Sequence, residues 1–198
     1  MNVLVVVAHP DPTSFNHALA GAAVRAARAQ GHEVVLRDLH AEGFDPVLPR
    51  GEFPREAPLE AGLRRHCDEL AAADGIVVVH PNWWGQPPAI LKGWIDRVVR
   101  PGVAYEFRDG DGGEGVPVGL LRARTAVVLN TANTPAARER EAFGDPLDAI
   151  WRRCVFGLCG VDDVRRRTYT VVVTSTPAER AAWLADAFAL VAEAFPAR

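Results

Sequence analysis

Five short runs rich in β-branched residues alternate with longer helical patterns along the chain, and this alternation limits the fold more than any other feature. The runs span residues 3–8, 33–39, 75–80, 125–130 and 168–174. Several are continuously apolar, which is typical of strands that are covered on both faces of a parallel sheet. Repeated alternation of strand and helix predicts an α/β sandwich with right-handed crossovers between parallel strands.

The helical patterns carry their own start and stop signals. They span residues 14–30, 59–73, 88–100, 146–158 and 177–195. The first ends before Gly31, a typical C-terminal capping residue, and the last begins Thr176-Pro177-Ala178-Glu179, which predicts Thr176 as its N-cap. Two segments fall outside the pattern. Residues 41–57 form a proline-rich connection, and residues 108–118, rich in glycine and aspartate, predict a flexible turn.

Composition narrows the possible partners. The chain has 198 residues, with 22 Lys and Arg against 25 Asp and Glu, and hence a net charge of −3. This length, without an internal repeat or linker, predicts a single domain over residues 1–198, and the charge disfavours nucleic acid or anionic membranes as partners. No apolar stretch reaches the roughly 18 residues of a membrane span. Cys67, Cys154 and Cys159 form no metal-binding spacing, so we expect a cytoplasmic protein without a bound metal.

Polar groups gather in the turn after the first predicted strand. In open parallel sheets, ligands bind beyond the carboxyl ends of the strands, where the strand order reverses. The turn reads His9-Pro10-Asp11-Pro12-Thr13-Ser14-Phe15-Asn16 and leads straight into a helix. The side chains of Thr13, Ser14 and Asn16 would meet free backbone N–H groups there, which suits a phosphate. The alternative is a helix N-cap made by Thr13 or Ser14, with His9 as a hydrogen-bonded structural residue.

The turns after the third and fourth predicted strands complete the same crevice. The third is followed by His80-Pro81-Asn82-Trp83-Trp84-Gly85-Gln86-Pro87-Pro88, and the fourth ends in Asn130-Thr131-Ala132-Asn133-Thr134-Pro135. Two adjacent tryptophans in a stiff loop either hold a planar aromatic ligand or cap the core. Together the three turns favour a cofactor that carries both a phosphate and an aromatic ring system, a flavin ahead of a nucleotide.

Other chemistries lack their motifs. No GxGxxG follows the first strand, and neither GxxxxGK[ST] nor GxSxG occurs, so nicotinamide-type Rossmann, P-loop and hydrolase readings are unsupported. A phosphoacceptor receiver domain would share the fold, and Asp11 follows the first strand. However, the third strand ends in His80 where such a domain would need an acidic acceptor.

At these turns the sequence resembles the NAD(P)H:quinone oxidoreductase family. The resemblance is carried by Ala8-His9-x-x-x-Thr13-Ser14-Phe15-Asn16, Pro81-x-x-Trp84, Pro88-Ala89-Ile90-Leu91-Lys92-Gly93-Trp94-Ile95-Asp96-Arg97-Val98, Ala104-Tyr105, Cys159-Gly160 and Thr176-Pro177-Ala178. It implies a three-layer flavodoxin-like doubly wound sandwich with a five-stranded parallel sheet in the order 2-1-3-4-5. It also implies a homodimer that binds a flavin. In a ping-pong mechanism, this flavin takes a hydride from NAD(P)H and then passes it to a quinone-like acceptor.

The resemblance also implies which residues form the site. The expected cofactor residues are His9, Thr13, Ser14, Phe15, Asn16, Pro81, Asn82, Trp83, Trp84, Gly85, Asn130, Thr131, Ala132 and Asn133. The expected substrate pocket contains Trp84 together with Tyr105, Phe107 and Leu158, the last three reaching it from the other subunit. The turn after the first strand resembles the FAD-binding members, so FAD is expected, with FMN as the alternative.

The chain departs from the family at its usual catalytic pair. No Tyr or His occurs between Asn130 and Trp151, so no catalytic side chain is carried over. Backbone groups or Asn133 are the hypothetical substitutes. Two alternative functions stay open: an ancillary flavoprotein that docks on a potassium-efflux transporter, and a dedicated biosynthetic reductase. A third, a flavodoxin-like electron carrier, is disfavoured by the small net charge. The acceptor and the preference between NADH and NADPH are not determined.

Overall fold

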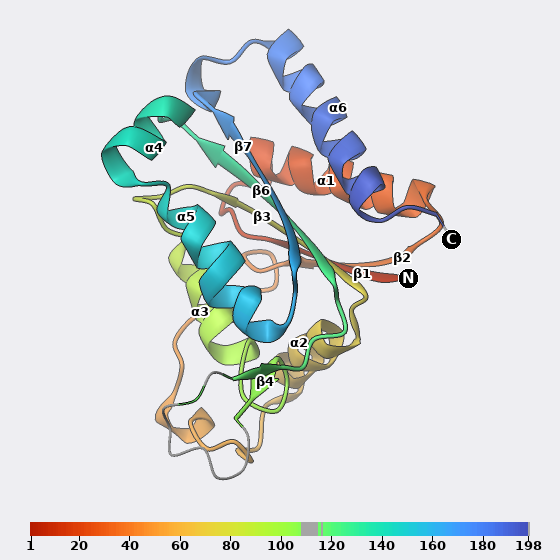
Figure 1. Cartoon of the computed structure of the whole chain (residues 1–198), viewed down its shortest axis with the longest axis vertical. Coiled ribbons are helices and arrows are strands. Elements are labelled where there is room, and N and C mark those ends of the chain that lie inside the picture. The colour runs from red at the N-terminus through yellow and green to blue at the C-terminus, as the bar shows by residue number, and fades with distance from the viewer. Residues whose placement is uncertain (108–114, 116, 198) are drawn as a thin grey trace.

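The structure, a computed structural model, describes residues 1–107, 115 and 117–197. The flexible turn predicted for residues 108–118 lies mostly outside these residues. In the described part, a central sheet separates two groups of helices, as Figure 1 shows. No helix there is both long and apolar enough to cross a membrane.

The central sheet has five parallel strands in the order β2-β1-β3-β6-β7. The strands are β1 (Asn2–Val7), β2 (Glu33–Asp38), β3 (Gly75–Pro81), β6 (Thr125–Ala132) and β7 (Asp163–Thr170). Numbered by their place along the chain, they follow the predicted order 2-1-3-4-5, which is confirmed. The order reverses between β1 and β3, and a crevice therefore opens beyond the carboxyl ends of these strands.

Helices cover both faces of the sheet. Helices α1 (Phe15–Ala29) and α6 (Pro177–Ala194) lie on one face, and α2 (Ala61–Ala72), α3 (Ala89–Val98) and α5 (Pro146–Ala149) lie on the other (Figure 1). Successive residues of a strand point to opposite faces, so β1 supplies Val5 to the core with Leu19 of α1 and Val6 to the core with Leu91 of α3. The continuously apolar strands are thus explained.

The helix boundaries follow the predicted capping signals. Ser14, one of the two candidates, is the N-cap of α1, and Gly31 takes a left-handed φ of 78° just beyond the C-cap of that helix. Thr176 and Glu179 form a reciprocal capping box at the start of α6. These two helices therefore begin where the sequence places them, which fixes the position of the α1 N-terminus beside the crevice.

The fifth strand corrects the prediction. The run at residues 168–174 was expected to form it, but β7 spans Asp163–Thr170, and Val172–Thr174 is a 3-10 turn. Val171 ends the strand with a positive φ of 60°. β7 is an edge strand that pairs with β6 alone, so most of its side chains are polar or charged and its sequence lacks the apolar signature of a central strand.

Two further elements differ from the prediction. The helix expected over residues 146–158 is divided into α5, a π-helical turn over Ile150–Val155 and a 3-10 turn over Gly157–Cys159. Helix α4 (Ala136–Phe143) was not predicted because it has no buried residue and hence no apolar stripe.

The chain also forms a small antiparallel pair of strands, β4 (Tyr105–Glu106) and β5 (Val118–Gly119), which the sequence analysis missed. Each strand has two residues, too few to show an alternating pattern. A Cβ atom added to Gly119 would lie 2.2 Å from the carbonyl carbon of Cys159, so this pair depends on a close backbone approach.

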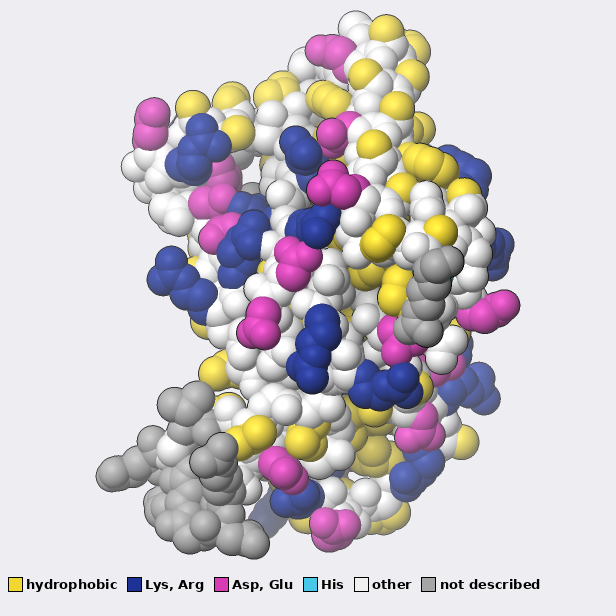
Figure 2. Space-filling view, turned by 45° about the vertical axis from the view of Figure 1, so that its right-hand side comes forward, with side chains coloured by type: hydrophobic (Ala, Val, Ile, Leu, Met, Phe, Trp, Pro, Cys, Tyr) yellow, Lys and Arg dark blue, Asp and Glu magenta, His cyan; other side chains and the backbone are white. Residues whose placement is uncertain are grey.

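The arginine run of β7 does not create a basic patch. Arg165 pairs with Asp163, Arg166 with Asp145, and Arg167 with Asp186. Figure 2 likewise shows charges of both signs interspersed over the face that it presents. This distribution agrees with the small net charge and gives a polyanion no continuous surface on that face.

Candidate functional site

A cavity of about 420 Å³ lies at the carboxyl ends of β1, β3 and β6. It is formed by the turns after these strands and by the segment that joins β7 to α6. Its lining residues are His9, Ser14, Phe15, Asn16, Pro81, Asn82, Trp83, Thr131, Ala132, Asn133, Thr134, Val172, Val173 and Arg180. The volume falls within the range of about 300–1,000 Å³ that is usual for small-molecule sites.

The turn after β1 is held by its own side chains. The Asp11 carboxylate accepts hydrogen bonds from the hydroxyl of Thr13 at 2.7 Å and from its backbone N–H at 2.8 Å, and both bonds lower the pKa of Asp11. The backbone N–H of Asp11 donates to Nδ1 of His9 at 3.1 Å, and partial burial lowers the pKa of His9. Thr13 is therefore engaged in the turn and does not line the cavity, whereas His9 does.

The first turn of α1 faces the cavity. The hydroxyl of Ser14 caps the helix by accepting from the backbone N–H of His17. Asn16 is buried, and its Oδ1 accepts from the Thr131 hydroxyl at 3.2 Å, which joins the turns after β1 and β6. The free N–H groups and the positive dipole end of α1 thus lie at the cavity wall, where an anion would be stabilised.

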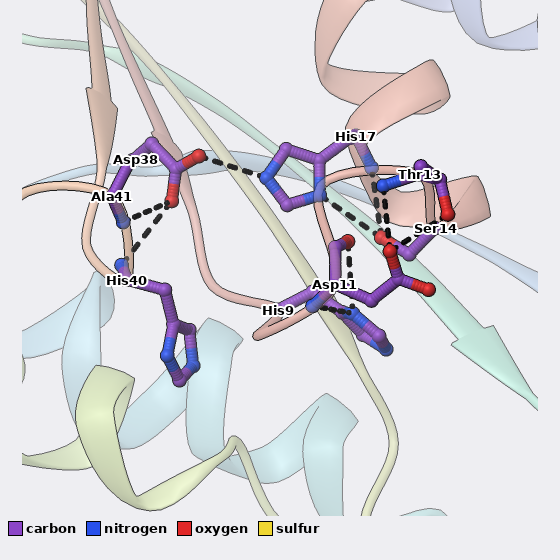
Figure 3. Close-up of polar contacts among 8 residues, drawn as sticks. All are labelled: His9, Asp11, Thr13, Ser14, His17, Asp38, His40 and Ala41. Atoms are coloured by element: carbon purple, nitrogen blue, oxygen red, sulfur yellow. Dashed lines mark hydrogen bonds and ion pairs between the residues drawn. The ribbon is translucent and has the colours of Figure 1, made fainter.

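The same turn contains a chain of polar contacts that runs away from the cavity. Ring nitrogen Nδ1 of His17 lies 3.0 Å from Oγ of Ser14, and Nε2 lies 2.8 Å from a carboxylate oxygen of Asp38 at the end of β2 (Figure 3). Neither His17 nor Asp38 lines the cavity. They contact it only through Ser14.

The loop after β3 directs its two tryptophans to different places. Trp83 lines the cavity, is 44% exposed, and packs against the His9 ring at a centroid distance of 5.9 Å. Trp84 has a positive φ of 58° and is fully exposed. Neither ring caps the core, and the alternative interpretation of the two tryptophans is therefore wrong.

Trp84 borders a second, more apolar hollow beside the cavity. This hollow measures about 330 Å³ and is lined by Asn82, Trp84, Gly85, Thr134, Glu139, Phe143 and Pro146. Asn82 and Thr134 line both spaces. The Asn82 amide donates to Oε1 of Glu139 at 2.9 Å and accepts from the Gly85 N–H at 2.9 Å. These bonds connect α4 to the loop of residues 82–88, called the tryptophan loop below.

The turn after β6 contributes unequally. Thr131, Ala132 and Asn133 line the cavity, and Oδ1 of Asn133 accepts from the backbone N–H of Val173 at 3.0 Å. Asn130 is fully buried below the cavity, where its amide donates to Nε2 of His80 at 2.9 Å. Asn130 therefore supports the site from beneath and does not line it.

Four lining residues were missed by the sequence analysis: Thr134, Val172, Val173 and Arg180. The last three follow β7. Val172 and Val173 were missed because the fifth strand was predicted over residues 168–174, which placed both residues inside the strand. Arg180 donates to the Val172 carbonyl at 3.1 Å and to the Ser175 hydroxyl at 2.8 Å, with its guanidinium 5.9 Å from the Phe15 ring centroid. No carboxylate of the described residues forms an ion pair with Arg180, so its charge remains available to an anion in the cavity.

The other three residues expected around the substrate lie apart from both spaces. The rings of Tyr105 and Phe107 pack edge to face at 5.9 Å next to β4, which follows the C-terminal end of α3, whereas the tryptophan loop precedes the N-terminal end of that helix (Figure 1). Leu158 lies in the 3-10 turn after α5 and is partly exposed. None of the three lines the cavity or the hollow of its own chain.

Strand order, crevice and lining residues together define a flavodoxin-like α/β protein with a ligand site at its topological switch point. The family model described as having a flavodoxin-like fold matches residues 1–191. An NAD(P)H oxidoreductase from Haemophilus influenzae is 32% identical over 171 residues, which cover 83% of this chain and 81% of that protein. The rat protein NAD(P)H dehydrogenase [quinone] 1 is 38% identical over 123 residues, which cover 52% of this chain but only 45% of the rat protein.

Solved structures of NAD(P)H:quinone oxidoreductases and related reductases superpose on this chain over nearly its whole length. A quinone reductase from Klebsiella pneumoniae superposes with a TM-score of 0.83 at 27% identity, covering all of this chain and 86% of that one. An NAD(P)H:quinone oxidoreductase from Methanothermobacter marburgensis superposes with a TM-score of 0.80 at 25% identity, covering 96% and 95% of the two chains. The chain belongs to the NAD(P)H:quinone oxidoreductase family of flavodoxin-like proteins.

Proposed function

We propose that this protein is a flavin-dependent NAD(P)H oxidoreductase that reduces quinones or related electrophilic acceptors by two electrons in a ping-pong cycle. The observation that carries the proposal is the cavity at the switch point, where a helix N-terminus, a tryptophan and an arginine with no ion-pair partner among the described residues meet. Membership of the family supports the same activity. The three described cysteines are free, which agrees with the expected cytoplasmic location.

The cavity offers suitable groups for the phosphate-bearing arm of a flavin. The first turn of α1 supplies backbone N–H groups, Ser14 supplies a hydroxyl, and Arg180 of α6 supplies a guanidinium that lies 5.9 Å from the ring centroid of Phe15. Arginine binds phosphate through several charge-assisted hydrogen bonds, while a helix N-terminus adds favourable partial charge. These donors fit an anionic group, and the Asp11 carboxylate in the turn after β1 is already engaged by Thr13.

The tryptophan loop suits the ring system. Pro81, Asn82 and Trp83 line the cavity, and Asn82 is fixed by hydrogen bonds to Gly85 and Glu139. A loop held in this way needs little reorganisation to receive a planar ligand. When bound, the flavin would supply the hydride chemistry, while the protein positions the ring and excludes water from it.

We assign the hollow beside Trp84 to the acceptor. Its walls are the rings of Trp84 and Phe143 with Pro146, and it adjoins the cavity through Asn82 and Thr134. In a homodimer, Tyr105, Phe107 and Leu158 of the second copy would close this open side. The amide group of Asn133 faces the cavity while its oxygen is held by Val173, so its N–H is the side-chain donor proposed to stabilise a reduced, anionic ring.

The proposed cofactor is FAD, because the turn after β1 resembles that of the FAD-binding members. The motif His9-x-x-x-Thr13-Ser14-Phe15-Asn16 supports FAD, with FMN as the alternative. Both share the ring system and a phosphate, so both agree with the donors described above.

A visible absorption spectrum of the purified protein tests the proposal. We expect a yellow protein whose chromophore, released by heat, chromatographs as FAD. NADPH should bleach it, and a simple quinone should restore the colour. A protein that is colourless and takes up neither added FAD nor added FMN would refute the proposal. Flavin binding without quinone turnover would instead favour the ancillary role on a potassium-efflux transporter.

A further inference from the structure

We propose that His17 is a positioning residue that decides whether the Ser14 hydroxyl can donate a hydrogen bond to a phosphate in the cavity. The inference rests on the proposed function, because it requires a phosphate-bearing ligand. It concerns residues that lie behind the cavity wall and do not touch the ligand themselves.

The geometry places the imidazole of His17 between a carboxylate and a hydroxyl. Nε2 lies 2.8 Å from Oδ2 of Asp38, and Nδ1 lies 3.0 Å from Oγ of Ser14 (Figure 3). The side chains of His17 and Asp38 are only 17% and 23% exposed, so bulk water screens the pair weakly. The other Asp38 oxygen accepts from the backbone N–H groups of His40 and Ala41, which holds the carboxylate in place.

The protons in this chain follow from what each group can do. An ionised carboxylate only accepts hydrogen bonds, so Nε2 of His17 carries a proton and donates it to Asp38. In a neutral ring, Nδ1 then has a lone pair and accepts the Ser14 O–H. The Ser14 oxygen meanwhile accepts from the backbone N–H of His17 at 3.4 Å. With a neutral His17, the hydroxyl proton points away from the cavity.

Protonation of His17 reverses the last contact. Nδ1 gains a hydrogen and donates to the Ser14 oxygen, and the hydroxyl proton is released to rotate toward the cavity. A positive charge also appears on His17, which contacts the cavity through Ser14. Both changes favour a bound phosphate, because a hydrogen bond from the Ser14 hydroxyl and a nearby positive charge each stabilise the negative charge of the phosphate.

The other charged groups around His17 do not reproduce this arrangement. In the β1 turn, the backbone N–H of Asp11 donates to Nδ1 of His9, and the Asp11 carboxylate accepts from the Thr13 hydroxyl. His40 follows β2 and lines a small space with His9 and His17, but among the described residues its buried Nε2 has no hydrogen-bond partner. Arg180 reaches the cavity from α6, and its positive charge does not titrate in the relevant pH range.

The expected consequence is a pH-dependent affinity for phosphate-bearing flavins. FAD is the probe, because its diphosphate carries constant charge in the range in which histidine titrates, about pH 5 to 8. We expect FAD to bind about tenfold more tightly at the acidic end than at the basic end, the size of one charge-assisted hydrogen bond. Riboflavin has the same ring but no phosphate, so its affinity should change little.

The experiment measures dissociation constants for FAD and riboflavin across this range, by calorimetry, in the wild type, in His17→Gln and in the matched control His40→Gln. We expect the FAD dependence to vanish in His17→Gln and to persist in His40→Gln. An equal dependence in the wild type and His17→Gln, or an equal dependence for FAD and riboflavin in the wild type, would overturn the inference while leaving the proposed function intact. A protein that binds no flavin at any pH would refute both.

A second readout needs no variant. The ¹⁵N chemical shifts of the His17 ring report which nitrogen is protonated. At basic pH we expect a proton on Nε2 alone, and binding of FAD should raise the pH at which Nδ1 becomes protonated. A proton on Nδ1 in the neutral ring, or a midpoint that FAD does not move, contradicts the proposed positioning role.

Discussion

His80 shows how much a single buried side chain contributes below the site. It is fully buried at the end of β3, where Nδ1–H donates to the Pro81 carbonyl at 2.8 Å. Nε2 accepts from the indole of Trp151 at 3.0 Å and from the amide of Asn130 at 2.9 Å. The ring is therefore held in its neutral form, and burial lowers the pKa of His80 from 6.5 to about 4.

This lowered pKa makes folding stability depend on pH. Below the unfolded-state pKa of 6.5 the unfolded chain binds a proton that the folded chain excludes, so stability is complete above that pH and is lost as the pH falls toward 4. The loss from this residue should total about 3 kcal/mol. Urea unfolding of the wild type and of His80→Gln at neutral and acidic pH measures it. If both lose the same stability, His80 is not the titrating group.

Arg180 should contribute to ligand affinity more than to stability. It faces the cavity without an ion-pair partner among the described residues and bonds to Val172 and Ser175. Arg180→Met should weaken FAD binding by about tenfold or more, the value of a charge-assisted hydrogen bond to phosphate, and leave riboflavin binding nearly unchanged. Arg28→Met, at an exposed site in the last turn of α1, is the control. Equal losses for both flavins would place Arg180 against the ring instead.

At the scale of elements, α3 depends on a glycine that admits a loop. A Cβ atom added to Gly93 would lie 2.2 Å from the carbonyl oxygen of Pro46, closer than any real contact. Gly93 is buried in the middle of α3, the helix that directly follows the tryptophan loop. The approach of residue 46 therefore requires glycine here, despite its low helix propensity.

Gly93→Ala should lower the free energy of unfolding by about 1–3 kcal/mol, because either the loop or the helix must shift. The matched control is Gly62→Ala in α2, where the added Cβ meets only Glu60 Oε1 at 4.0 Å. That change should stabilise the protein by roughly 0.5–1 kcal/mol through helix propensity. Chemical denaturation of both variants decides, and a neutral or stabilising Gly93→Ala would contradict the packing argument.

At the scale of the whole molecule, we propose that a second copy of the chain completes the substrate pocket. Tyr105, Phe107 and Leu158 lie outside the cavity and the hollow, and the last two are 47% and 40% exposed. Phe107 packs against Tyr105, and exposed apolar side chains that lie together are typical of an interface. We therefore expect light scattering to give the mass of a homodimer.

Leu158→Asp should shift this mass toward the monomer, lower quinone turnover, and leave FAD binding largely intact, since the proposed cofactor residues all belong to one chain. Leu36→Asp, on the outer strand β2 with a similar exposure of 46%, is the control and should keep the dimer. A wild-type monomer with full quinone turnover would exclude any role of a second copy in the pocket.

Much of the architecture was predictable from the chain itself. Strands buried on both faces are apolar at most positions, so β1, β3 and β6 were visible as continuous runs. The end of α1 at Gly31 and the start of α6 at Thr176 depend on local hydrogen bonding and were predicted for the same reason. The turns after β1, β3 and β6 follow directly from these elements, and so did the residues Ser14, Asn82 and Asn133.

What the sequence could not supply is the outcome of contacts between distant segments. An edge strand such as β7 and an exposed helix such as α4 bury little, so their residues carry no periodic signal. The separation of Trp83 from Trp84 depends on the left-handed backbone of Trp84 and Gly85, and Asn130 is held below the cavity by its bond to His80. The residue pattern by itself therefore indicated the central strands and the place of the site, while the strand order was implied by the resemblance to a known family. Tertiary packing decided which side chains face the cavity, since that depends on burial and partners far away in sequence.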